Sequence, residues 1–196
     1  LELYQAYADW TDIMELAENL VEHLAIETTG SSTITYDGRE VNLAAPWRRA
    51  TLIELIAEHA DVQVSMDMPL DELRAICDKL GVQHKPSYGP GKLILEIYEK
   101  TVEGNLWQPT FVTEYPKEVS PLAREHRDLP DMTERFEAIV CGRELCNGFS
   151  ELVDPVEQRL RFEEQARQKD AGDDEAMVVD DDYVRALEFG LAPTGG

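Results

Sequence analysis

The strongest constraint on the fold is the order in which two kinds of hydrophobic periodicity follow one another along the chain. Strand-like alternation of apolar and polar residues occurs at 1–8, 108–115 and 136–152. Between the first two of these stretches, residues 46–100 show helical periodicity and no strand signal. Strands separated by one helical block differ from the regular strand–helix alternation of a parallel sheet. The sequence therefore predicts an α+β fold with a small helical insertion at 46–100.

Capping and turn residues locate the individual elements. Asp9 precedes apolar residues at helical spacing and is a suitable N-cap, and Asp37-Gly38 is a hairpin turn within 33–43. Gly81 ends a helix at 69–80. We expect the remaining helices at 51–59, 93–102, 155–169 and 181–189, with an acidic connector, AGDDEAMVVDDD, between the last two.

The charge and the cysteine and histidine content exclude several classes of site. The chain has 196 residues, with 40 acidic and 18 basic side chains and a net charge of −22, which repels a nucleic-acid backbone as a whole. Cys77, Cys141 and Cys146 have no CxxC spacing, and the four histidines are scattered, so a zinc site and a Cys–His dyad are not expected. Since no apolar run approaches the roughly 20 residues that span a bilayer, we expect a cytoplasmic protein without a membrane partner.

Two glutamates lie in the strand-rich stretch FEAIVCGRELCNGFSEL. If residues 139–142 reverse the chain, Glu137 and Glu144 face each other across a hairpin, about 5 Å apart. Two carboxylates that close repel each other and need a cation. Mg²⁺ bridging to a phosphate is the natural one. The alternative is a pair of surface glutamates on an exposed hairpin.

Asn147, Phe149 and Glu151 follow at every second position, so they share one face of a strand. An amide, an aromatic wall and a carboxylate suit a small zwitterion with a cationic end. Glu2 and Tyr4 repeat the combination of an acid and an aromatic on one strand face. The alternatives are an edge strand with one polar face and an ordinary exposed strand face.

Four blocks of the sequence carry further information: LELYQAYADW, PTFVTEYPKEVSPLAR, RFEAIVCGRELCNGFSEL and AGDDEAMVVDDDYVRALEFGLAPTGG. Together they resemble the class II lysyl-tRNA synthetases, in which the blocks have the same order. The resemblance covers essentially the whole chain. It implies an antiparallel sheet flanked by helices, usually in a homodimer, and the ATP-dependent ligation of lysine to its tRNA.

The resemblance also implies roles for the residues singled out above. Glu137 and Glu144 are similar to the carboxylates that hold Mg²⁺ on the ATP phosphates. The implied lysine contacts are Asn147 at the carboxylate, Phe149 and Tyr4 along the side chain, and Glu2 and Glu151 at the ammonium groups. Which acid binds which amine is left open.

The resemblance places the chain in the middle part of a catalytic domain. The family's first motif, its two arginines on the ATP phosphates and its anticodon-binding barrel fall outside residues 1–196. We therefore expect this segment alone to be inactive and the main tRNA contacts to lie elsewhere. Two alternatives remain: a paralogue that attaches a lysine-like group to a protein, whose relatives tend to differ at Ser150, and a non-catalytic binding protein on the same scaffold.

Overall fold

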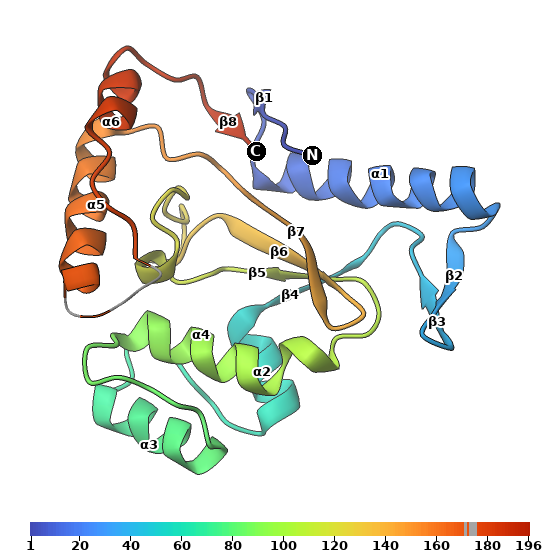
Figure 1. Ribbon diagram of the computed structural model, residues 1–196, viewed down its shortest axis with the longest axis horizontal. Coiled ribbons are helices and arrows are strands. Elements are labelled where there is room, and N and C mark those ends of the chain that lie inside the picture. Colours follow the sequence, from blue (N-terminus) through green and yellow to red (C-terminus); the bar gives the residue numbers. More distant parts are fainter. Residues whose placement is uncertain (171, 173–175) are drawn as a thin grey trace.

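A four-stranded sheet forms the centre of the protein in the computed structural model, which describes residues 1–170, 172 and 176–196 (Figure 1). Its strands lie in the order β4 (Arg48–Thr51), β5 (Thr110–Thr113), β6 (Arg135–Val140) and β7 (Arg143–Phe149). The first pair is parallel and the other two pairs are antiparallel. The expectation of a mostly antiparallel sheet flanked by helices is confirmed.

Helix α1 (Trp10–Thr29) covers one face of this sheet. Asp9 begins it as predicted, because its side chain accepts from Thr11 N–H while Asp12 bonds back to the Asp9 N–H. Beneath the helix, the Phe111 and Phe136 rings meet edge to face at 5.2 Å and are both buried. Each such ring stabilises the fold by about 1.5–3 kcal/mol relative to exposure, so α1 is firmly attached to β5 and β6.

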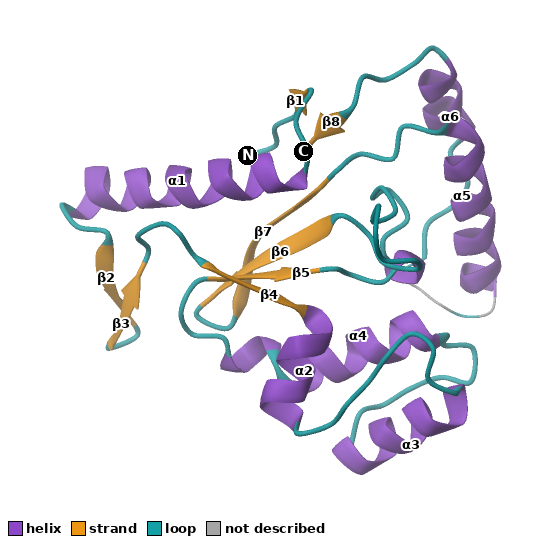
Figure 2. Cartoon of the chain, turned by 180° about the vertical axis from the view of Figure 1, so that it is seen from behind, coloured by secondary structure: helices purple, strands orange, loops and turns teal. Residues whose placement is uncertain are grey.

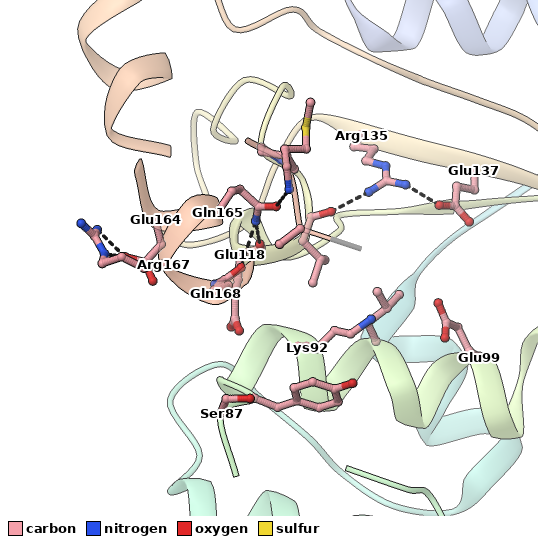
Figure 3. Close-up of a pocket in the computed structure, with 16 residues that line it drawn as sticks. Ser87, Lys92, Glu99, Glu118, Arg135, Glu137, Glu164, Gln165, Arg167 and Gln168 are labelled. Carbon is pink, nitrogen blue, oxygen red and sulfur yellow. Dashed lines mark hydrogen bonds and ion pairs between the residues drawn. The ribbon is translucent and has the colours of Figure 1, made fainter. Parts of the chain in front are cut away.

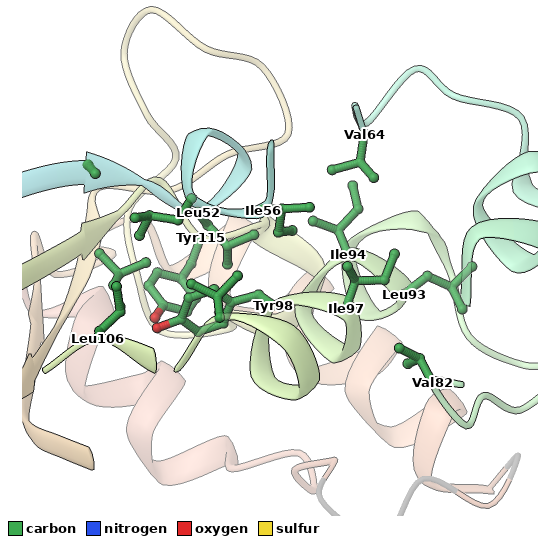
Figure 4. Close-up of a cluster of buried hydrophobic side chains, with 14 of the residues drawn as sticks. Leu52, Ile56, Val64, Val82, Leu93, Ile94, Ile97, Tyr98, Leu106 and Tyr115 are labelled. Carbon is green, nitrogen blue, oxygen red and sulfur yellow. The ribbon is translucent and has the colours of Figure 1, made fainter. Parts of the chain in front are cut away.

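Helices α2 (Leu52–Ala60) and α4 (Pro90–Thr101) cover the opposite face of the sheet, and α3 (Leu70–Leu80) packs on α4 farther from the strands (Figure 2). All three lie close to the predicted ranges. The buried apolar cluster between them and the sheet includes Ile56, Ile94 and Ile97, together with Val112 and Ile139 from the strands (Figure 4). Phe111 and Val112 are consecutive residues of β5, so their side chains point to opposite faces of the sheet. Each face therefore has its own hydrophobic core.

The predicted absence of a strand in 46–100 is wrong. β4 lies within this stretch and pairs with β5 from Arg48 opposite Thr110 to Thr51 opposite Thr113. Two consecutive arginines and one buried alanine give this short strand no apolar alternation, so its pairing with β5 defines it. Residues 46–100 therefore contribute one strand of the central sheet as well as helices.

The hairpin predicted at 33–43 is confirmed as β2 (Thr33–Tyr36) and β3 (Arg39–Asn42). Asp37 and Gly38 both have positive φ, as a two-residue hairpin turn requires. By contrast, the predicted strand at 1–8 is reduced to β1 (Gln5–Ala6). β1 pairs with β8 (Thr194–Gly195), and Gly195 in turn bridges to Ser150, which attaches both ends of the described chain to the end of β7.

The remaining helices lie at both ends of the sheet. The short 3₁₀ helix η1 (Glu103–Asn105) lies beside the turn between β6 and β7, where Gly142 N–H donates to Leu106 O. At the opposite end are η2 (Lys117–Val119), also a 3₁₀ helix, and the helices α5 (Pro155–Asp170) and α6 (Asp181–Glu188). Part of the predicted acidic connector, at 171 and 173–175, lies outside the described residues. Among the described residues, no helix is both long and apolar enough to cross a membrane.

Candidate active site

One cavity of about 580 Å³ brings together all five residues that the sequence predicts to contact a zwitterion. Glu2 and Tyr4 come from the segment before β1, Asn147 and Phe149 from β7, and Glu151 from the residues after it. Much of the remaining wall is apolar and comes from α1, at Ile13, Leu16, Ala17, Leu20 and Val21. The fold thus provides one enclosure with acidic, aromatic and aliphatic parts, as a lysine side chain would need.

Gly196 joins the two segments that form this cavity. Its N–H donates to Phe149 O at 3.1 Å, and the Phe149 N–H donates to its carbonyl at 2.8 Å. A Cβ at this position would lie 2.6 Å from the Tyr4 ring and 3.0 Å from Glu151 Oε1. A glycine therefore lets the backbone pass between the aromatic and acidic walls without filling the space between them.

Glu151 is the most unusual group in the cavity. It is 7% exposed, and its carboxylate has neither a hydrogen bond nor an ion pair in the described part of the chain. Burial raises the pKa of Glu151 to about 7. A buried carboxylate without a cation is costly, so this position favours a ligand that brings a positive charge.

Glu2 and Tyr4 lie on the exposed rim, outside a strand, contrary to the sequence prediction. Their side chains nevertheless lie together, since the Tyr4 hydroxyl donates to Glu2 Oε1 at 2.5 Å. This hydrogen bond raises the pKa of the Tyr4 hydroxyl to about 12, and the hydroxyl is protonated at neutral pH. The cavity therefore has one buried acid, Glu151, and one acid at its mouth, Glu2.

The predicted register of the β6–β7 hairpin is wrong. The turn is formed by Cys141 and Gly142, both with positive φ, and the pairing shifts at a bulge beyond Ile139. Glu137 consequently lies opposite Asn147, and Glu144 lies opposite Ile139. The extra residue in β7 is Leu145, which the turn alone does not predict.

The bulge still leaves Glu137, Glu144 and Asn147 on one face of the sheet. Ile139 and Glu137 are two residues apart on β6, so their partners across the hairpin face the same side. The Asn147 amide donates to Glu144 Oε1 at 3.1 Å. Burial raises the pKa of Glu137, and the charge of Glu144 acts in the same direction. The two carboxylates therefore repel each other although they are not direct cross-strand partners.

Arg135 is a functional candidate that the sequence reasoning missed. Its Nη2 contacts Glu137 Oε1 at 2.6 Å, and its charge opposes the rise in the pKa of Glu137. The detectable signal was its position, two residues before Glu137 on the same strand and hence on the same face. The protein thus supplies one cation for this pair of acids.

The donor set fits a hard divalent cation bound together with a phosphate. No group of three or more His, Cys, Asp or Glu side chains arranged to hold a metal occurs among the residues described. Two carboxylates and an amide oxygen on one face still suit Mg²⁺, which often binds one or two carboxylates and takes its other ligands from phosphates and water. The partial site here matches that mode of binding.

A second cavity, of about 480 Å³, opens beside Glu137 (Figure 3). It lies between α4, η2 and α5, and its lining includes Lys92, Glu118 and Arg167 as well as Arg135 and Glu137. Ion pairs already involve several of these groups, including Lys92 with Glu96 and Arg167 with Glu164. The charged space next to Glu137 is thus open but lined by groups that largely neutralise one another.

Comparison with known proteins identifies the family of the chain. The profile of the family described as tRNA synthetases class II (D, K and N) matches residues 1–196. A lysine–tRNA ligase of Porphyromonas gingivalis strain W83 is 48% identical over the whole chain, and one of Chromohalobacter salexigens is 50% identical over 197 aligned positions. A third, from Moorella thermoacetica, is 45% identical. The chain spans 34%, 39% and 40% of these three relatives, respectively. With one family profile matching from end to end and relatives at this identity, the chain belongs to the class II tRNA synthetases.

Proposed function

We propose that this chain forms the lysine pocket and the Mg²⁺–ATP carboxylates of a lysine–tRNA ligase. One observation carries the proposal: Glu151 is buried with no cation partner among the described residues, in a cavity that four other predicted lysine contacts also line. The relatives named lysine–tRNA ligase support the choice of lysine among cationic ligands.

The reaction has two steps. A carboxylate oxygen of lysine attacks the α-phosphorus of ATP, and the bond to the bridging oxygen breaks, so that pyrophosphate leaves and lysyl-adenylate remains. A hydroxyl of the terminal tRNA ribose then attacks the lysyl carbonyl and AMP leaves, while the hydroxyl proton passes to solvent or phosphate. Neither step needs a nucleophile from the protein, so catalysis consists of positioning and charge stabilisation.

The residues of this chain have distinct tasks in that scheme. Phe149 and Tyr4 flank the methylene chain of lysine, and the amide of Asn147 orients its carboxylate near the nucleotide. Glu151 and Glu2 accept hydrogen bonds from the two ammonium groups. Mg²⁺, when bound by Glu137 and Glu144, would neutralise the phosphates and orient them.

The buried acid also explains selectivity. If Glu151 binds the distal amine, an amino acid of similar length without that amine would leave its buried carboxylate unpaired, and such unmet polar groups reject ligands strongly. The methylene chain of lysine gains binding energy from the aliphatic wall of α1, but this contact does not distinguish lysine from other amino acids of similar length. The charge of one amine therefore separates lysine from its apolar analogues.

The competing functions predict different flanking chemistry. A paralogue that modifies a protein would keep the lysine cavity but not the tRNA reaction, and a binding protein would keep neither ATP step. Ser150, at which such paralogues tend to differ, is 3% exposed, and its hydroxyl accepts the first N–H of α1 from Trp10 at 3.1 Å. Ser150 thus has a structural task here, which weakens it as a marker of function.

The same proposal extends to parts that this chain does not carry. In a complete ligase, we expect a homodimer in the cytoplasm, with most tRNA contacts on other segments, since this chain carries a net charge of −22. We also expect residues 46–100 to act as an insertion in the catalytic domain. We expect the segment 1–196 by itself not to form the adenylate.

Lysine-dependent exchange of pyrophosphate into ATP, measured on the complete protein that carries this chain, tests the proposal. Glu151→Gln should raise the KM for lysine far more than the KM for ATP. We expect the variant to lose about 2–5 kcal/mol of the free energy of lysine binding. Glu163→Gln, at a half-buried glutamate on α5 that does not line the cavity, is the matched control. Exchange that does not depend on lysine, or an unchanged KM for lysine in Glu151→Gln, would contradict the assignment.

A further inference from the structure

Arg135 is bound on two sides by different parts of the chain. Its Nη2 contacts Glu137 Oε1 on β6 at 2.6 Å. On the other side, Nη1 donates to Val119 O at 3.0 Å and to Ser120 Oγ at 3.1 Å. The guanidinium also lies over the Tyr115 ring, 4.7 Å from its centroid. These four contacts, with β6 and with residues 115–120, determine both the position and the plane of this group. Figure 3 shows Arg135 beside Glu137.

The segment that holds Arg135 is itself fixed to the helical block. Glu118, in η2, accepts the backbone N–H groups of Gly89 and Gly91 at 3.0 and 2.9 Å, at the start of α4. A Cβ on Gly89 would lie 2.5 Å from the Glu118 carboxylate and would displace it from this position. From the other direction, Gln165 of α5 donates to Glu118 O at 3.2 Å. Arg135 is therefore anchored to a segment that α4 and α5 both hold.

We propose that Arg135 is a positioning residue for Glu137, holding one carboxylate oxygen so that the group presents a fixed orientation to the metal–nucleotide complex. This inference rests on the proposed function, because it takes Glu137 as a metal ligand. Arg135 contacts no substrate in the proposal and acts through Glu137. The residues that orient a metal ligand commonly change metal affinity by 10–100-fold when they are removed.

Arginine suits this task better than lysine would. Its planar group has separate donors for Glu137 on one edge and for Val119 and Ser120 on another, and a flat face for Tyr115. An ammonium could keep the charge beside Glu137 but could not maintain all of these directions at once. The charge and the orientation can therefore be separated by substitution.

Two possible roles of Arg135, its charge alone and its orientation of Glu137, predict opposite changes in metal affinity for Arg135→Met. Removing a cation next to Glu137 should strengthen the binding of a divalent cation if charge is all that matters. If Arg135 orients Glu137, Arg135→Met should weaken metal binding despite the loss of a competing positive charge. Arg143→Met is the matched control, because Arg143 is an exposed arginine on the same hairpin and its replacement by methionine removes the same charge.

The test is a titration of the complete protein with Mn²⁺, in which the free ion is followed by its electron paramagnetic resonance signal. We expect Arg135→Met to bind Mn²⁺ about 10–100-fold more weakly, Arg135→Lys to be intermediate, and Arg143→Met to stay within about twofold of the parent. Thermal unfolding of each variant is measured alongside. A purely structural Arg135 would lower the melting temperature without changing the affinity.

The outcomes separate this inference from the function on which it rests. If Glu137→Gln binds Mn²⁺ as the parent does, the assigned metal role of Glu137 fails. If Glu137→Gln loses the ion but a folded Arg135→Met binds it equally or more tightly, the positioning role alone is overturned. Should Arg135→Met not fold, Arg135→Lys and Ser120→Ala decide the matter, since each keeps the charge and disturbs the geometry, and unchanged affinity in both overturns the inference.

Discussion

Replacing Glu151 by glutamine should stabilise the folded protein at neutral pH while removing its function. The carboxylate is 7% exposed and has no cation partner in the described structure, and its pKa is about 7 against an ordinary 4.5. At about 1.4 kcal/mol per pKa unit, the ionised form costs the fold at most about 3.5 kcal/mol. Water that enters the open cavity reduces this, so we expect about 2 kcal/mol.

The sign follows from the raised pKa. Below about pH 4.5, Glu151 is protonated in both the folded and the unfolded chain, and the two proteins should have similar stabilities. Between pH 4.5 and 7 the unfolded chain loses this proton first, so the wild type loses stability relative to Glu151→Gln. The difference should be complete above about pH 7.

Urea unfolding of both proteins at pH 4.5, 6 and 8 measures this difference directly. We expect the variant to be more stable by about 2 kcal/mol at pH 8 and nearly equal to the wild type at pH 4.5. Lysine at 100 times its dissociation constant should add about 2.7 kcal/mol to the wild type and far less to the variant. Parallel stability curves across this pH range would mean that another group compensates the charge of Glu151, which would refute the reasoning.

Three further perturbations follow from other contacts. Glu137→Gln should raise the Mg²⁺ concentration needed for half-maximal pyrophosphate exchange by about 10-fold or more, since a metal ligand is lost, and an unchanged requirement would remove Glu137 from the metal site. Arg127→Met should lower the free energy of unfolding in urea by about 2 kcal/mol, because Glu134, which is 1% exposed, loses its bidentate partner. The comparison is Arg74→Met, which should stay within about 0.5 kcal/mol because the side chain of its partner Asp71 is 96% exposed. Gly91→Ala should lower the thermal midpoint, since its Cβ would lie 2.8 Å from Pro116 Cβ, while Gly104→Ala, with nothing within 4 Å, should not.

Local signals in the sequence were sufficient for the helices. Asp9 begins α1 and Gly81 ends α3 as predicted, because a capping side chain and a left-handed glycine act within one turn of the helix. The hairpin at Asp37-Gly38 was equally local, since both residues adopt the positive φ that the turn needs. These elements do not depend on what packs against them.

Features set by distant neighbours could not be predicted in the same way. β4 exists because β5 provides a parallel partner, although Arg48 and Arg49 give no strand signal of their own. The pairing of Glu137 with Asn147 depends on a bulge at Leu145, which the sequence near the turn does not specify. Arg135 was missed because its partners Val119 and Ser120 belong to a separate segment.

The candidate site shows the same division. The resemblance predicted which residues gather, and the structure does place Glu2, Tyr4, Asn147, Phe149 and Glu151 around one cavity. It did not predict that one acid would be buried and the other at the rim, which depends on the path of residues 194–196 beside β7. In the proposed function, that asymmetry distinguishes the two acids that would bind the two amines of lysine.

The most direct test of the central claim is calorimetric titration of the complete protein with lysine, norleucine and 6-aminohexanoate. Norleucine lacks the distal amine of lysine, and 6-aminohexanoate lacks the α-amine. We predict that the wild type prefers lysine to both, and that Glu151→Gln loses its preference over one of these analogues while Glu2→Gln loses part of its preference over the other. A protein that binds lysine and norleucine equally well, or a Glu151→Gln variant that keeps both preferences, would contradict the claim that this cavity recognises lysine through its buried acid.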